Sequence, residues 1–291
     1  MVKLERVLVL ADGERTLAKG LQDELVSWLE SRVGSVECVE DPLAWEAQRK
    51  SLDVQPPSPD LLVVIGGDGA LLGAVRAFAL APPPTVGIHA GRVGFLASTT
   101  ASRWQETLEA VLAGECLLQQ RMRIQADWES EGQSGSAVAL NEIVLQRGTR
   151  EGMLVARLSM GDQWVNDYRA DGLIVATPSG STAYSLSAGG PILEPSVEGI
   201  VVTPLSSQGL STRPIVLGAA GVLRLRVLSA SGLSTLAIDG QSYHRLTEGS
   251  SIMIRRHPEP YPLFVMPGLD PFRRLRSRLG WGNGLEEKPT T

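Results

Sequence analysis

The stretch of residues 60–79 most constrains the fold, because an apolar run stops at a glycine turn and a second apolar run follows. Residues 61–65, with the sequence LLVVI, are short, partly β-branched and bounded by glycines, which predicts a fully buried strand of a parallel sheet. Residues 70–79 carry Arg76 as their only charge and predict a helix packed on that sheet. A strand, a glycine turn and a helix N-terminus together form an anion site, because unpaired backbone N–H groups face outward.

The glycine turn matches neither of the two common phosphate loops. Walker A requires Lys followed by Ser or Thr after its last glycine, where this chain has Ala70, and the dinucleotide fingerprint would place its third glycine at Leu72. Gly66 and Gly67 are expected at the phosphates, yet Asp68 would repel a bare pyrophosphate. We interpret its carboxylate as a proton acceptor for a substrate hydroxyl, or as a partner of phosphates through a divalent cation. A helix N-cap role explains Asp68 equally well.

Composition and charge exclude several classes of protein. The chain has 291 residues, which suggests about two domains. Its net charge of −5 argues against nucleic acid as the main partner, and its two cysteines and three histidines lack disulfide or zinc spacing. Residues 172–193 carry no charge but are too rich in Gly, Ser, Thr and Pro for a membrane span. We expect a cytoplasmic protein without signal peptide or membrane partner, in which this stretch is buried or faces a ligand.

The periodicity of the chain changes near residue 117. Before it, strands alternate with helices, which predicts an α/β domain with a doubly wound, Rossmann-like parallel sheet. Ligands bind such sheets beyond the carboxyl ends of the strands, where Asp68 and Phe95 lie. After it, short strands follow one another and predict an all-β sandwich. We therefore predict an α/β domain of residues 1–119 and 258–291, and an all-β domain of residues 120–257. The strands predicted in the second domain include residues 124–128, 137–146, 155–159, 173–176, 200–202, 222–227 and 234–238.

Asn141 and Glu142 form a polar pair inside one of these predicted strands. Side chains alternate along a strand, so the two are expected to point to opposite faces, with at most one facing the core. Taken alone, the pair favours a structural use, in which one side chain is solvated and the other bonds a neighbouring loop.

The run of residues 169–191 leads from a strand into a turn dense with hydroxyl groups and small residues. Tyr184 offers a ring for stacking, and Asp171 can accept a hydrogen bond from an amine or a ribose hydroxyl. Planar contact with a few directional polar groups is typical of nucleoside recognition. A Ser–His–Asp hydrolase is conceivable, but residues 179–181 lack the nucleophile-elbow pattern.

In these motifs the chain resembles the bacterial-type NAD kinases of the ATP- or polyphosphate-dependent family, over nearly its whole length. The resemblance rests on residues 66–69 (GGDG), 91–96 (GRVGFL), 141–142 (NE), 171–191 and 239–241 (DGQ). The glycine loop alone is weakly specific, since diacylglycerol and sphingosine kinases and phosphofructokinases have similar loops. The sequence TPSGSTAYSLS after Asp171 and Gly172 is highly specific. Ala70 stands where many members have threonine.

The resemblance implies transfer of a phosphoryl group from ATP or another donor to the 2′-hydroxyl of the adenosine ribose of NAD, with Asp68 as the catalytic carboxylate. It implies Mg²⁺ held by phosphates and water without direct protein ligands, and a homodimer or homotetramer in which a neighbouring subunit completes the NAD site. A lipid or sugar kinase with the same loop and a non-catalytic dinucleotide sensor are the alternatives. The residues implied at the substrate, mostly in the all-β domain, are Gly69, Phe95, Asn141, Glu142, Arg169, Asp171, Thr182, Ala183, Tyr184, Ser185, Leu186, Ser187, Ser206 and Gln241.

Overall fold

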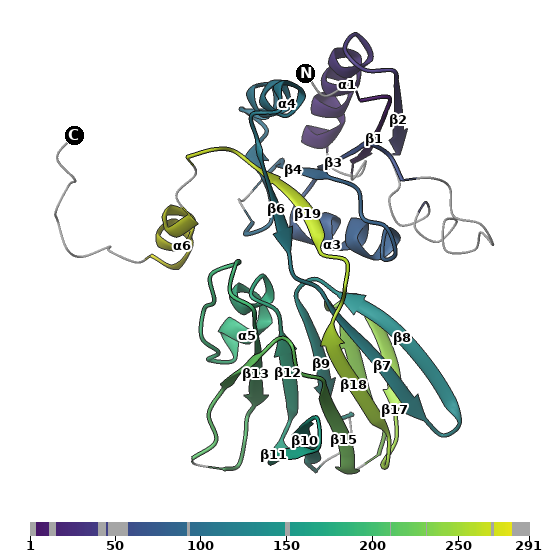
Figure 1. Ribbon diagram of the computed structural model, residues 1–291, viewed down its shortest axis with the longest axis vertical. Coiled ribbons are helices and arrows are strands. Elements are labelled where there is room, and N and C mark those ends of the chain that lie inside the picture. Colours follow the sequence, from purple (N-terminus) through teal and green to yellow (C-terminus); the bar gives the residue numbers. More distant parts are fainter. Residues whose placement is uncertain are drawn as a thin grey trace, which may run out of the picture.

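The computed structural model describes residues 4–11, 16–39, 45, 58–91, 94–148, 152–209, 211–230, 232–268 and 271–280. An α/β part and a β part lie end to end, and the chain crosses between them twice, from β6 to β7 and from β18 back to β19 (Figure 1). No helix in the described ranges has both the length and the apolar character needed to span a membrane.

The α/β part is built on a seven-stranded sheet with the order β2-β1-β3-β4-β19-β6, in which β5 also pairs with β4. The prediction of a purely parallel sheet is wrong at one edge, where β6 is antiparallel to β19. The chain leaves through β6 and returns through β19, so these two neighbours run in opposite directions. The strands are β1 (Arg6–Ala11), β2 (Ser35–Val39), β3 (Leu61–Ile65), β4 (Thr85–His89), β5 (Thr99–Thr100), β6 (Leu117–Arg121) and β19 (Tyr261–Val265).

Strand β3 is buried along its whole length, as its apolar sequence predicts. Leu61, Val63 and Ile65 share one core with residues of α1 (Thr16–Glu30) and α4 (Trp104–Ala113). Leu62 and Val64 lie in a separate core with residues of α3 (Asp68–Ala77). Helices therefore cover both faces of the sheet, which explains why β3 has no polar side. The last described helix is α6 (Pro271–Leu279).

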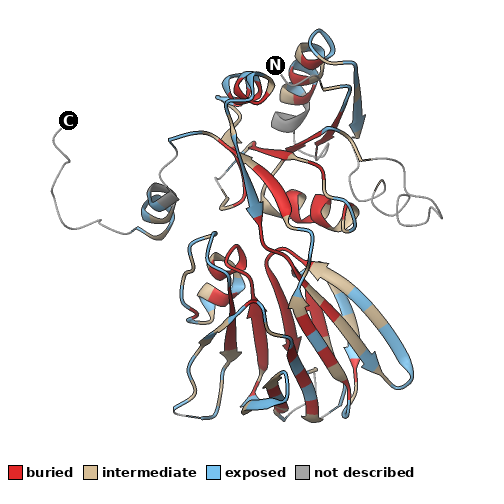
Figure 2. Ribbon diagram, in the orientation of Figure 1, coloured by how far each residue is buried: buried red, intermediate tan, exposed pale blue. Residues whose placement is uncertain are grey.

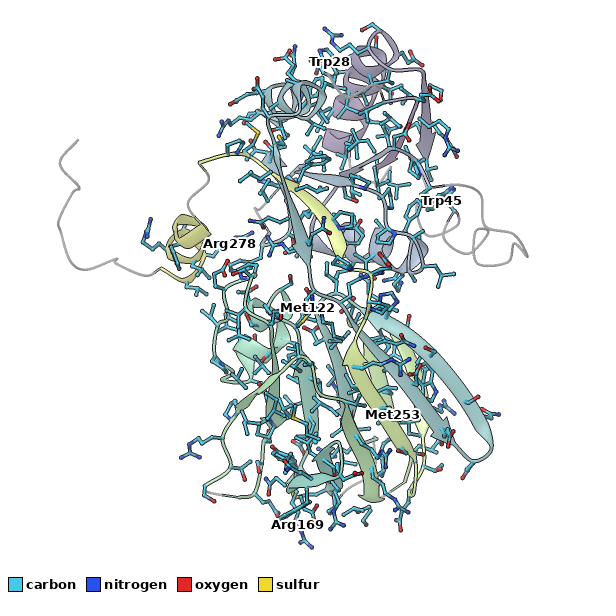
Figure 3. All side chains as sticks on the ribbon, viewed as in Figure 1. Trp28, Trp45, Met122, Arg169, Met253 and Arg278 are labelled. Carbon is cyan, nitrogen blue, oxygen red and sulfur yellow. The ribbon has the colours of Figure 1, made fainter. Side chains whose placement is uncertain are left out.

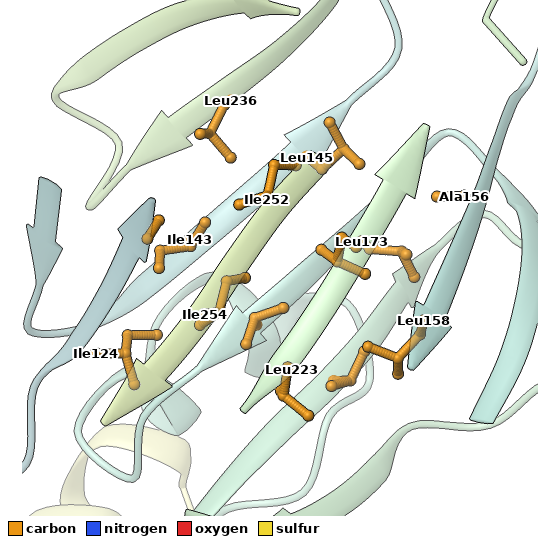
Figure 4. Close-up of a cluster of buried hydrophobic side chains, with 14 of the residues drawn as sticks. Ile124, Ile143, Leu145, Ala156, Leu158, Leu173, Leu223, Leu236, Ile252 and Ile254 are labelled. Carbon is orange, nitrogen blue, oxygen red and sulfur yellow. The ribbon is translucent and has the colours of Figure 1, made fainter. Parts of the chain in front are cut away.

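The β part consists of two six-stranded antiparallel sheets, with the orders β11-β10-β15-β18-β7-β8 and β14-β13-β12-β9-β16-β17. Side chains such as Ile124 and Ile252 of the first sheet meet Ile143 and Leu173 of the second in one buried cluster (Figure 4). The strands are β7 (Ile124–Ser130), β8 (Gln133–Ala139), β9 (Glu142–Gln146), β10 (Leu154–Met160), β11 (Gln163–Ala170), β12 (Gly172–Ala176), β13 (Gly199–Leu205), β14 (Ile215–Gly218), β15 (Leu223–Ser229), β16 (Ser234–Ile238), β17 (Ser242–Leu246) and β18 (Ser251–Arg256).

Two details differ from the sequence prediction. Residues 137–146 do not form one strand, because β8 ends at Ala139 and β9 begins at Glu142, in different sheets. The predicted domain limits remain predictions, although β6 runs through the limit drawn at residue 119. Between β12 and β13 lie a short 3-10 turn (Gly180–Thr182) and α5 (Tyr184–Ser187).

Arg123 is fully buried where the chain first crosses between the two parts. Its Nε donates to the carbonyl of Glu259 and its Nη1 to the carbonyl of Ala79, both at 2.8 Å. Its Nη2 lies 3.2 Å from Nδ1 of His257. One guanidinium group thus joins both crossings to the loop that follows α3.

We expect Arg123→Lys to lower the free energy of unfolding by about 2 to 4 kcal/mol, because an ammonium cannot reach both buried carbonyl groups. Denaturant titration measures the loss. The exposed Arg224→Lys change on β15 is the control and should cost under about 0.5 kcal/mol. Equal stabilities of the two variants would contradict the role of Arg123 at the crossing.

Candidate active site

The Asp68 carboxylate lies at the junction of two loops that follow neighbouring parallel strands, β3 and β4. Its Oδ2 accepts the N–H of Phe95 at 2.8 Å, and its Oδ1 accepts the N–H of Leu96 at 3.1 Å. Asp68 is the first residue of α3, Gly67 is the N-cap, and no side chain caps this helix. The carboxylate therefore serves the loop of residues 94–96 instead of its own helix, and the N-cap explanation is wrong.

Gly94 allows this close approach. A Cβ atom built on Gly94 would lie 1.8 Å from Oδ1 of Asp68, so no side chain larger than hydrogen fits there without displacing the carboxylate. A carboxylate offers about four lone-pair positions, and the two backbone contacts leave the others for a ligand. Gly69, the next residue, accepts a hydrogen bond from the Gln241 side chain at 3.1 Å. The β part therefore contacts the glycine loop directly.

Asn141 and Glu142 lie where β8 gives way to β9, and both are buried. The expectation that they alternate across one strand is wrong, because the chain passes from one sheet to the other there. Three successive N–H groups, those of Leu140, Asn141 and Glu142, turn toward the carboxylate of Asp239 at 2.8 to 2.9 Å. Asn141 Oδ1 and Glu142 Oε2 are buried without a hydrogen-bond partner among the described residues, which suits polar atoms that bind a ligand.

The environment of Glu142 favours its neutral form. Burial, together with the nearby Asp239 carboxylate, raises the pKa of Glu142 to about 8, although a hydrogen bond from the Tyr184 backbone opposes the shift. Burial also raises the pKa of Asp239, to about 6, against its three backbone hydrogen bonds and the positive charge of Arg76. Near neutral pH Glu142 therefore carries a proton and can donate a hydrogen bond to a ligand.

The charge-free run after Asp171 is buried from Gly172 to Ser181, as expected for a stretch that is buried or faces a ligand. Several of its hydroxyl groups bond within the protein. Ser181 Oγ donates to the carbonyl of Pro178 and accepts the N–H of Leu193, while Ser185 Oγ pairs with Thr203. These hydroxyl groups fold the turn that carries Thr182, Ala183, Leu186 and Ser187, and Tyr184 at its surface is 42% exposed.

The structure divides the predicted site residues of the β part between the two ends of β12. At one end, Ala176 pairs with Glu142 and the N–H of Thr177 donates to Asn141. At the other, Gly172 pairs with Leu205, so Asp171 and Ser206 lie together there. Arg169 is at that end too, far from α3 (Figure 3). At about 3.3 Å per residue, Asp171 and Thr177 are roughly 20 Å apart. Buried residues fill β9 and β12 between them (Figure 2).

Sequence reasoning missed Asp239 as a site residue, although its motif was noted. The available signal was an Asp-Gly pair after an apolar alternating strand, which is typical of a tight hairpin turn.

Two surface hollows, of about 640 and 590 Å³, lie around β7 and β8 and include none of the predicted site residues. Within the described part of the chain, no cluster of three or more His, Cys, Asp or Glu side chains could hold a metal ion.

Comparison with known proteins decides the family. The family model of the ATP-NAD kinase N-terminal domain matches residues 1–116, and that of the C-terminal domain matches residues 140–265. The chain belongs to the ATP-NAD kinase family. It is 39% identical to an NAD kinase of Nitrosospira multiformis over 232 residues, 79% of this chain and 78% of that protein. It is 34% identical to an NAD kinase of Heliobacterium modesticaldum over 284 residues, 94% of this chain and 98% of that one.

Solved structures of an NAD kinase and of an NADH kinase share the two-part fold. The crystal structure of an NAD kinase from Archaeoglobus fulgidus in complex with ATP has a TM-score of 0.76 and 25% identity, covering 94% of this chain and 98% of that one. Yeast NADH kinase complexed with NADH has a TM-score of 0.84 at 23% identity, covering 99% and 90%, and supports the fold alone. Family membership makes this chain a kinase that phosphorylates NAD, and favours neither the lipid or sugar kinase nor the non-catalytic sensor.

The raised pKa of Glu142 predicts how stability changes with pH. An acid whose pKa is higher in the folded state, here about 8 against 4.5, costs stability as pH rises from about 4.5 to about 8. Glu142→Gln has no such cost. The variant should therefore gain in melting temperature over the parent across that window and level off above it. The limiting difference in the free energy of unfolding is on the order of 5 kcal/mol.

Scanning calorimetry from pH 5 to pH 9 measures this gain. Glu131→Gln, in the exposed turn between β7 and β8, is the matched control for the chemical change. A constant offset between Glu142→Gln and the parent over the whole range would contradict the assignment of a neutral Glu142.

Proposed function

We propose that this kinase transfers the γ-phosphoryl group of ATP to the 2′-hydroxyl of the adenosine ribose of NAD, with Asp68 as the carboxylate at that hydroxyl. The observation that carries the proposal is the position of Asp68 on the glycine loop, where two backbone N–H groups hold its oxygens. This fixes a hydrogen-bond acceptor at the N-terminus of α3, where phosphate oxygens are also favoured.

Phosphoryl transfer depends mostly on positioning and on charge stabilisation. A carboxylate is too weak a base to deprotonate a sugar hydroxyl in advance. Asp68 therefore orients the hydroxyl, and takes its proton late, as the oxygen bonds to the γ-phosphorus. The bond between that phosphorus and the β–γ bridging oxygen breaks, and ADP leaves with the bridging electrons.

The chain's own residues suit a metal ion that arrives with the nucleotide. The glycine loop has no lysine, and Asp68 is its one carboxylate. Mg²⁺ would be held by phosphate oxygens and water near Asp68, and when bound would neutralise phosphate charge.

The buried pair Asn141 and Glu142 supplies polar contacts to the nucleoside. The unpaired Oδ1 of Asn141 accepts a hydrogen bond from an amino or hydroxyl group, and the neutral Glu142 donates or accepts one. Tyr184 and the turn of residues 182–187 lie beside them, since the Tyr184 backbone bonds Glu142. A planar base of the nucleotide can stack on the Tyr184 ring, because this ring is partly exposed.

The group of Arg169, Asp171 and Ser206 acts on the same dinucleotide from a second subunit. Support comes from its place at the end of β12 opposite to Asn141, together with the family resemblance. A homodimer or homotetramer then has composite sites in which one subunit supplies Asp68 and its partner supplies Asp171. We place this assembly in the cytoplasm.

Asp68→Asn should lower kcat for NADP formation at least 100-fold while the Kd for NAD stays within about threefold, because the hydroxyl loses its proton acceptor and one of the two loop N–H groups loses its partner. Purified protein with NAD, ATP and Mg²⁺, coupled to an NADP-specific dehydrogenase, measures turnover, and calorimetry measures NAD binding. Gly94→Ala should cause a similar loss by displacing the carboxylate. Gly91→Ala, whose Cβ would have no atom within 4 Å, is its control. A near-parental kcat in Asp68→Asn would contradict the proposed role of Asp68 as the proton acceptor.

Mixing two inactive variants tests the composite site. Asp68→Asn and Asp171→Ala subunits, denatured and refolded together, should regain up to about a quarter of the parental activity at equal mixing of a dimer, because mixed dimers contain one intact site. Each variant refolded alone is the control. Activity no higher than that of the two separate samples would place Asp171 outside the site.

A further inference from the structure

The turn of residues 239–241 contacts both halves of the proposed active site. It joins β16 to β17, and its first two residues have positive φ angles, 48° at Asp239 and 62° at Gly240. The N–H of Gln241 donates to the carbonyl of Ile238 at 3.0 Å, and the Tyr243 hydroxyl donates to the carbonyl of Gly240 at 2.8 Å. These bonds close the turn and fix the directions of the two side chains at its ends.

The Asp239 side chain points back to the neighbouring strand. Its own N–H donates to the carbonyl of Glu142 at 2.9 Å, while its Oδ1 accepts the N–H groups of Asn141 and Glu142 and its Oδ2 that of Leu140. These donors are buried where β8 ends and β9 begins, so without the carboxylate each would lack a partner, which destabilises a buried N–H group. The carboxylate thereby sets the backbone from which Asn141 and Glu142 project.

The Gln241 side chain points to the other part of the molecule. Its Nε2 donates to the carbonyl of Gly69, the residue after Asp68. Gly69 is exposed, and a Cβ built on it would lie 3.9 Å from the same Nε2 atom. Gln241 was expected at the substrate from sequence, but here its amide supports the first turn of α3.

We propose that Asp239 and Gln241 are positioning residues, which set the NAD pocket and the catalytic carboxylate, respectively, from one rigid turn. This inference rests on the proposed function and deepens it. Asp239 acts through the backbone of residues 140–142 and so controls NAD affinity. Gln241 acts through Gly69 and so controls the alignment of Asp68 with the hydroxyl, which affects turnover more than binding.

Asp239→Asn and Gln241→Met separate the two roles. The amide introduced by Asp239→Asn cannot accept from all three N–H groups, so the KM and Kd for NAD should rise at least tenfold with a smaller fall in kcat. Methionine keeps the length of Gln241 without its donor, so kcat should fall at least tenfold with the Kd for NAD within about threefold. Gln241→Glu, which also lacks the donor, should match Gln241→Met. Gln105→Glu, on the exposed surface of α4, is the control for added charge.

The outcomes are distinct. Unchanged NAD affinity in Asp239→Asn, or unchanged kcat in Gln241→Met, would overturn the inference. If the wild-type protein forms NADP in the same assay, the proposed function still stands. A wild-type protein that bound NAD without forming NADP would overturn the proposed function alone, since NAD calorimetry on Asp239→Asn still tests the first role. If Asp239→Asn is unfolded, Thr177→Val replaces it, because Thr177 Oγ1 donates to the carbonyl of Leu140 in the same segment at 2.5 Å. Unaltered NAD affinity in Thr177→Val would equally contradict the role of residues 140–142 in NAD binding.

Discussion

The convergence of three backbone N–H groups on the Asp239 carboxylate is the interaction on which the pocket depends. Where the chain leaves one sheet for the other, it gives up ladder hydrogen bonds in a buried place, and a single carboxylate replaces them. The same negative charge, together with burial, keeps Glu142 protonated. One side chain therefore sets the geometry of the pocket and adds to the burial that keeps its acid protonated.

Asp68 uses the same chemistry at the glycine loop. Its carboxylate also accepts backbone N–H groups from a distant segment, but only two, and it remains partly exposed. The Asp239 carboxylate is occupied by three backbone N–H groups, whereas Asp68 keeps lone pairs that a substrate can use. The number of backbone donors thus separates a structural carboxylate from one that remains available for chemistry.

Local patterns predicted the parts of the fold that local forces decide. The apolar run of β3, the glycine turn and α3 follow from neighbouring residues, and so does the burial of the charge-free run. The break between β8 and β9 does not, because the carboxylate that accepts its N–H groups lies 97 residues beyond Glu142. The antiparallel edge of the first sheet depends equally on β6 and β19, which are far apart in the chain.

The candidate site could be predicted as a set of residues but not as a geometry. Hydroxyl groups such as those of Ser181 and Ser185 suggest ligand contacts by composition, yet their bonds to Pro178 and Thr203 are visible only in three dimensions. The N-cap explanation of Asp68 could likewise be rejected only once its contacts with Phe95 and Leu96 were known.

Strand β12 explains why one chain does not bring all of these residues together. It is buried throughout and paired on both sides, and Gly172 fits against the carbonyl of Leu145 so closely that a Cβ would lie 2.5 Å from it. Such a strand cannot bend to carry Asp171 toward Asp68. If Asp171 touches the dinucleotide at Asp68, it does so from another copy of the chain, and activity then requires association.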